Sequence, residues 1–101
     1  RGESFSPTDL AATSLGACML TIMGIAARKQ GVDLGDTQVK VLKEMTPKPP
    51  RRIAKVTVVF TIPLPASHEK RAMLEEAARN CPVHLSLDPG VEQEMRFDWV
   101  G

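Results

Sequence analysis

The sequence predicts an α+β fold in which a long helix and a second, shorter helix pack with antiparallel strands. Three observations carry this prediction: a capped apolar segment at residues 6–31, two β-branched segments at 37–62 joined by a proline-rich connection, and an amphipathic segment at 67–80 followed by a last strand. The chain has 101 residues, which fits one domain of common size. We therefore expect residues 1–101 to form a single domain.

The first helix has clear start and stop signals. Ser6 is a capping residue before Pro7 at the first helical position, and Asp9 lies in the first turn, where the helix dipole favours an acid. Basic residues occupy the last turn and Gly31 ends the helix. The helix is apolar nearly all round, which is typical of a buried helix. Since so short a chain buries a limited share of its surface, we expect a partner subunit to supply part of the core.

Two strands follow the first helix. Residues 37–45 form the first, with Val39, Val41 and Lys43 on one face, and residues 53–62 form the second, which is rich in β-branched residues. Prolines at 47, 49 and 50 separate them, so the pair is predicted to be a long hairpin.

The remainder predicts a helix, a short helix and a strand. Ser67 is expected to cap a helix that runs through Asn80, after which Cys81 and Pro82 break it. A short helix follows from Pro82 to about residue 87, and residues 91–100 form the last strand.

The charge balance excludes several classes of partner. Thirteen Lys and Arg against twelve Asp and Glu give a net charge of +1, so we expect neither nucleic acid nor an anionic membrane as a partner. The longest apolar stretch, residues 15–27, is too short and mixed to be expected to span a bilayer. No signal peptide is recognisable, and the cytoplasm is the expected compartment.

Neither a cofactor nor a metal is expected. There is no glycine-rich phosphate loop, and Ser14 lacks the glycine-flanked elbow of a hydrolase nucleophile. Cys81 and His84 have a C-x-x-H spacing, but a structural zinc site takes four ligands, and only Cys18, His68 and carboxylates remain to complete one.

The two cysteines are the strongest candidates for chemistry. In a reducing compartment, two cysteines far apart in sequence are more often free, catalytic or redox-active than a structural disulfide. Cys18 lies within the apolar helix, where a cysteine often serves only as a small hydrophobic residue. Cys81 precedes Pro82, so its sulfur lies at a helix start that favours thiolate, although it could be an N-cap alone.

Two stretches resemble the signatures of the OsmC/Ohr family, the osmotically inducible and organic hydroperoxide resistance proteins. In residues 6–18, SPTDLAATSLGAC, Pro7 opens the helix and Cys18 follows eleven positions later, as the first reactive cysteine of that family does. Residues 77–87, AARNCPVHLSL, are similar to its second signature, an alanine-rich helix that ends in Cys-Pro-Val. The order of elements between them also agrees, so the resemblance covers essentially the whole chain.

The resemblance implies an intertwined homodimer, with long central helices wrapped by sheets of both subunits. It also implies a peroxiredoxin-type activity in oxidative stress, the thiol-dependent reduction of organic hydroperoxides. Cys18 would become a sulfenic acid, Cys81 would condense with it to a disulfide, and an external dithiol would reset the pair.

The sequence departs from the family at the group that activates the thiol. Family enzymes use an arginine held by a glutamate beside the opening proline, but here Thr8 follows Pro7, and Asp9 is the nearest carboxylate. Asp9 therefore joins Cys18 and Cys81 as an expected catalytic residue.

The family's arginine belongs to N-terminal strands that are not part of this sequence, and the spacing of Arg1 does not match. One alternative is therefore an OsmC-fold protein without peroxidase activity, either a redox sensor or a binder of an apolar molecule in a dimer cleft lined by Met19, Leu20 and Met23. The other is a purely structural interaction domain.

Overall fold

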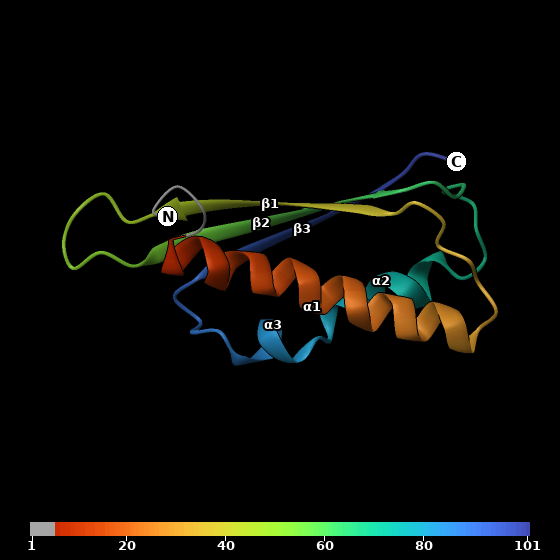
Figure 1. Ribbon diagram of the computed structural model, residues 1–101, viewed down its shortest axis with the longest axis horizontal. Helices are drawn as coiled ribbons and strands as arrows, with labels where there is room; N and C mark the ends of the chain where they lie inside the picture. Colours follow the sequence, from red (N-terminus) through yellow and green to blue (C-terminus); the bar gives the residue numbers. More distant parts are fainter. Residues whose placement is uncertain (1–5) are drawn as a thin grey trace.

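The computed structural model describes residues 6–101, which form one three-stranded sheet with helices on one of its faces (Figure 1). The two layers follow from the sequence pattern, because the sheet-facing residues of the helices and one face of the strands are apolar. The elements in chain order are α1 (Pro7–Lys29), β1 (Gln38–Met45), β2 (Ile53–Ile62), α2 (Arg71–Arg79), α3 (Pro82–Ser86) and β3 (Glu92–Trp99).

The predicted start and stop of α1 are confirmed. The Ser6 hydroxyl accepts the backbone N–H of Asp9 at 3.1 Å, Pro7 opens the helix, and basic residues fill its last turn. Gly31 then takes a φ of +69°, a left-handed conformation that ends helices and that side chains with a Cβ rarely adopt.

The predicted hairpin is confirmed, and the third strand joins it in the opposite sense. β1 pairs with β2 antiparallel, with Val41 opposite Val58, whereas β3 pairs with β2 parallel, with Met95 opposite Val58. The expectation of antiparallel strands throughout is wrong for β3. A parallel partner requires a long crossover, which α2 and α3 provide on the helical face.

One side of α1 lies directly on the sheet. A Cβ built on Gly16 would lie 2.6 Å from Cγ2 of Val41, so the glycine permits this close approach. The core is formed by the buried residues Ala12, Leu15, Met19, Met23, Ala27, Val56, Val58, Phe60, Ile62, Leu74, Ala78 and Cys81. The opposite side of α1 is exposed within the chain, as at Leu10 and Ile25.

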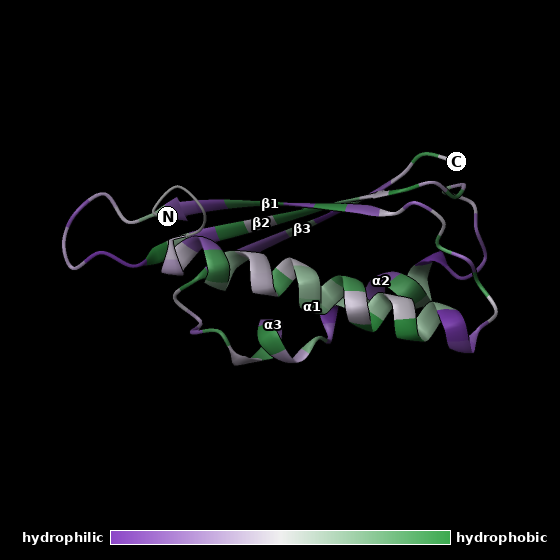
Figure 2. Ribbon diagram, viewed as in Figure 1, coloured by the Kyte–Doolittle hydropathy of each residue, from purple (hydrophilic) through white to green (hydrophobic). Residues whose placement is uncertain are grey.

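Figure 2 shows α1 green or white along most of its length, with purple at its C-terminal turn. Among the described residues it is the one helix long and apolar enough to cross a membrane by length and composition. The expectation that the apolar stretch is too short is therefore wrong, because apolar character continues outside residues 15–27 across a 23-residue helix. Core helices share this property, and α1 lies against the sheet along one side.

The helix α2 begins later than the sequence predicts. Ser67 does not cap it, and Lys70 occupies the N-cap position without a side-chain hydrogen bond. The preceding residues form turns in which the ring nitrogen Nδ1 of His68 accepts the backbone N–H of Lys70 at 3.0 Å. This local side-chain contact competes with an earlier helix start.

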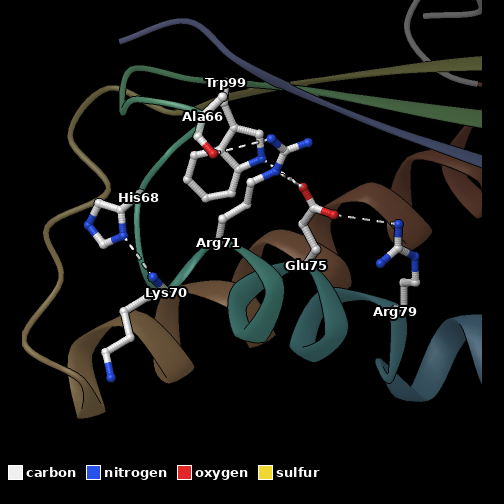
Figure 3. A network of polar contacts seen from close by, with 7 residues as sticks. All are labelled: Ala66, His68, Lys70, Arg71, Glu75, Arg79 and Trp99. Carbon is white, nitrogen blue, oxygen red and sulfur yellow. Dashed lines mark hydrogen bonds and ion pairs between the residues drawn. The ribbon is translucent and has the colours of Figure 1, made fainter.

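A polar network joins α2 to the end of β3 (Figure 3). Glu75 Oε2 accepts hydrogen bonds from Arg71 Nε at 3.0 Å and from Trp99 Nε1 at 2.8 Å, while its Oε1 lies 3.7 Å from Arg79 Nη2. The Arg79 guanidinium also lies 5.0 Å from the centre of the Phe97 ring. The network fixes α2 on the sheet, and the C-terminal end of α2 leads directly into Cys81.

Candidate redox site

The two cysteines meet between α1 and α3, although 63 positions separate them in the sequence. Cys18 lies on the flank of α1 and is partly exposed, whereas Cys81 is the fully buried N-cap of α3. Both are free thiols, and that of Cys18 is near enough to act on the ionisation of Cys81. The thiol of Cys18 is therefore accessible to a small reactant, whereas the thiol of Cys81 is covered.

The surroundings of Cys81 oppose its ionisation. Burial is the main cause of a raised pKa, the backbone N–H of His84 lowers this pKa by donating to Sγ at 3.2 Å, and the Cys18 thiol raises it further. The expectation that the helix start favours the thiolate of Cys81 is therefore wrong for the net direction of its pKa. The predicted hydrogen bond is present, but the loss of water around the sulfur outweighs it.

A second pair of polar groups lies beside Cys81. The ring nitrogen Nδ1 of His84 lies 2.6 Å from Oε1 of Gln93, and Nε2 of Gln93 donates to the backbone carbonyl of His84 at 3.4 Å. Sequence reasoning missed Gln93. The available signal is that Gln93 shares the inward face of β3 with Met95, Phe97 and Trp99, since strand residues two positions apart lie on the same face.

Asp9 is engaged elsewhere in this chain. Its Oδ1 lies 2.7 Å from Nζ of Lys43, which also donates to the Thr8 hydroxyl at 2.8 Å, and the pair lowers the pKa of Asp9. Lys43 reaches the helix because it faces α1 from β1, as predicted. Asp9 and Cys18 are nine positions apart in the sequence, which places them on opposite flanks of α1 and about 13 Å apart along its axis. The structure does not bring Asp9 to the thiols of its own chain.

Several arginines also have partners away from the thiols. Arg71 and Arg79 pair with Glu75, and Arg96 pairs with Asp98. Arg1, considered above as an activating group, lies outside the described residues.

The proposed apolar cleft is not formed by this chain. Met19 and Met23 have no exposed surface and belong to the core, so they cannot line a cleft, and only Leu20 of the three is partly exposed. An open surface depression of about 420 Å³ does occur at the C-terminal end of α1, between Gly24 and Gly35. Within residues 6–101, no three His, Cys, Asp or Glu side chains gather as they would around a metal ion.

Comparison with protein families places this geometry among known proteins. The model of the OsmC-like proteins matches residues 1–96. The chain belongs to the OsmC-like family. Among solved structures, this OsmC-like chain is similar to a Psychrobacter arcticus protein named for osmotic stress induction and a detoxification response, with 39% identity and a TM-score of 0.87 over 96% of this chain and 70% of the other.

More distant structures share the fold of this OsmC-like protein. An organic hydroperoxide resistance protein OsmC of Legionella pneumophila has 18% identity and a TM-score of 0.77, over 97% of this chain and 72% of the other. The organic hydroperoxide resistance protein OhrB of Bacillus subtilis has 20% identity and a TM-score of 0.72, over 95% and 73%. No match was found among curated proteins. The predicted family and its α+β fold are thus confirmed.

Proposed function

We propose that this OsmC-like protein reduces organic hydroperoxides with Cys18 and Cys81 as its redox pair. The observation that carries the proposal is the meeting of these two thiols between α1 and α3, one partly exposed and the other buried. The names of the Legionella and Bacillus relatives support an organic hydroperoxide as the substrate. We expect the reaction in the cytoplasm, where free thiols persist.

In the first step, the partly exposed Cys18 reacts as its thiolate. Its sulfur attacks the distal oxygen of ROOH, the O–O bond breaks, and RO⁻ takes up a proton to leave as the alcohol. Sulfur is oxidised to the sulfenic acid while the peroxide is reduced. Asp9 holds Lys43 on the opposite flank of α1, so this pair has no direct part in the step within one chain.

In the second step, the sulfur of Cys81 attacks the sulfur of the Cys18 sulfenic acid. The S–O bond breaks, the hydroxyl leaves as water after protonation, and a disulfide forms. An external dithiol then reduces the disulfide by two exchange steps and restores both thiols. Because burial raises the pKa of Cys81, this step is expected to accelerate as the pH rises.

The test is hydroperoxide consumption by the full chain with dithiothreitol as the reductant and cumene hydroperoxide as the substrate. Cys18→Ser is expected to abolish turnover. Cys81→Ser is expected to form no internal disulfide after one equivalent of peroxide, as mass spectrometry would show, because its Cys18 sulfenic acid can be reduced only by dithiothreitol itself. Unchanged consumption by folded Cys18→Ser would overturn the assignment.

We further propose that two copies of the chain associate through the exposed side of α1. Leu10 and Ile25 are 61% and 44% exposed on this side, in a helix whose other side is fully covered. Ile25→Glu is expected to produce monomers in sedimentation experiments. Leu42→Glu is a matched control, because Leu42 is 49% exposed on the face of β1 opposite to the one that packs on α1. Dissociation by the control alone would contradict this interface.

A redox sensor is the second candidate. It is favoured by Thr8 at the position of the family's glutamate, since Thr8 and the neighbouring Asp9 both contact Lys43 instead of an arginine. A sensor would oxidise once per chain when no reductant is present and would consume peroxide only slowly with dithiothreitol, so the rate of turnover separates the two functions.

A further inference from the structure

The short helix α3 has limited hydrophobic anchoring, with Val83 as its residue that packs against the core. It has five residues, none of them fully buried, and Leu85 is 66% exposed. A helix of this length is not stable by itself in water. Contacts from outside the helix must therefore set where its backbone lies relative to Cys81.

Gln93 provides such a contact from β3. Its side-chain amide joins both the ring and the backbone carbonyl of His84, at 2.6 Å and 3.4 Å. The amide N–H donates to the carbonyl, so the amide oxygen faces Nδ1 and must accept a hydrogen bond from its N–H. The reverse orientation would place two acceptors against each other at the carbonyl. His84 thus carries its proton on Nδ1 whenever it is neutral.

The same residue that Gln93 holds is the donor to the buried sulfur. The backbone N–H of His84 lies 3.2 Å from Sγ of Cys81, and this hydrogen bond stabilises the sulfur most when it is negatively charged. We propose that Gln93 is a positioning residue for the resolving thiol, and that it acts through His84 by holding this N–H on the sulfur of Cys81. The inference rests on the proposed function for its role in turnover, but not for its effect on the thiol.

The first experiment measures the ionisation of Cys81 without any peroxide. In a Cys18→Ser background, which removes the neighbouring thiol, the ultraviolet absorbance of the thiolate is followed as the pH rises. Gln93→Leu is expected to move the midpoint upward by about half to one pH unit, the scale of a weakened hydrogen bond to a charged group. Glu92→Gln is the matched control, because Glu92 is an exposed neighbour in β3 that contacts Lys55.

Two further variants keep the test independent of folding defects. His84→Leu removes the donor to Gln93 and is expected to shift the midpoint as Gln93→Leu does. His84→Asn places an amide N–H near the position of Nδ1 and is expected to restore a midpoint close to that of the background. A midpoint unmoved by both leucine variants in folded protein would overturn the proposal, even if their stability fell.

The second experiment measures disulfide formation after one equivalent of cumene hydroperoxide in chains that retain both cysteines. Gln93→Leu is expected to slow the loss of the Cys81 thiol about threefold to tenfold at neutral pH. This change in rate is equivalent to the expected shift of about half to one unit in the midpoint of thiolate formation. The oxidation of Cys18 is expected to keep its rate. If no oxidation occurs in any chain, the proposed function fails while the absorbance experiment still decides the role of Gln93. If Cys81 is lost at the same rate in both chains, the role of Gln93 in turnover is overturned.

Discussion

The two sides of α1 have similar sequence character but different surroundings. On the side facing the sheet, Leu15, Met19 and Met23 have no exposed surface, and Gly16 allows close contact with β1. On the other side, Leu10 and Ile25 remain largely exposed within the chain. Cys18 lies on the flank between these two sides, which explains why it is partly accessible. The helix therefore contributes to a core and to an uncovered surface at once.

The largest expected difference between the two sides comes from shortening one leucine on each, Leu15 on the buried side and Leu10 on the exposed side. Leu15→Ala is expected to lower the free energy of unfolding by about 2–5 kcal/mol, because it opens a cavity in a fully packed core. Leu10→Ala is expected to change it by less than about 0.5 kcal/mol in the monomer. Urea unfolding of both variants measures the difference. Equal losses would contradict the distinction between the two sides.

The two glycines of α1 give a smaller and opposite pair of effects. Gly16→Ala is expected to cost about 1–3 kcal/mol, because the new Cβ would lie 2.6 Å from Val41. At Gly24 nothing lies within 4 Å of the same atom, so Gly24→Ala is expected to stabilise the helix by about 0.5–1 kcal/mol. Thermal unfolding at low protein concentration tests this pair. Combining Gly16→Ala with Val41→Ala should recover part of the loss, and failure to do so would place the strain elsewhere.

The buried thiol is expected to give a smaller, pH-dependent effect. Because the folded protein raises the pKa of Cys81 above the usual 9.0, the protonated thiol stabilises the fold. This contribution is complete below pH 9.0 and is lost as the pH rises from that value through the higher folded pKa. Urea unfolding of the native chain and Cys81→Ala across this range measures it. The stability difference between them should shrink as the pH rises, and a constant difference would contradict the raised pKa.

The smallest effect is expected at the exposed start of α1. Lys43→Met removes the partner of Asp9, whose pKa this lysine lowers. A lowered pKa contributes stability above the usual value of 3.8 that is lost as the pH falls through the folded value. The variant should therefore be slightly less stable than the native chain at neutral pH. This difference in the free energy of unfolding should shrink as the pH falls below 3.8, and added salt should reduce it. Unfolding curves at two salt concentrations provide the measurement.

Local signals in the sequence predicted the elements with few errors. Ser6, Pro7 and Gly31 defined α1, because caps and left-handed glycines act within a few residues. The same reasoning failed at Ser67, where the ring of His68 satisfies the backbone instead. It also could not show that β3 runs parallel to β2, since strand direction depends on the path of the whole crossover.

The candidate site was predictable in part for a similar reason. The spacing of Cys18 and Cys81 within two motifs was visible, and the structure brings them together. The ionisation of Cys81 was not predictable, because burial by distant elements outweighs the local hydrogen bond. Gln93 and Lys43 gained their partners from α3 and α1, contacts across the fold that no sequence spacing shows.

The meeting of α1 and α3 has a consequence for the connectivity of the chain. A disulfide between Cys18 and Cys81 would close a covalent ring around β1, β2 and α2, the hairpin and the helix that carries the Glu75 network. Closing a ring of this length restricts the unfolded chain and is worth about 4 kcal/mol in the entropy model. The oxidised molecule would then contain a closed covalent ring and unfold less readily than the reduced chain. Exposure to peroxide would therefore raise the stability of the protein until a dithiol reduced the disulfide.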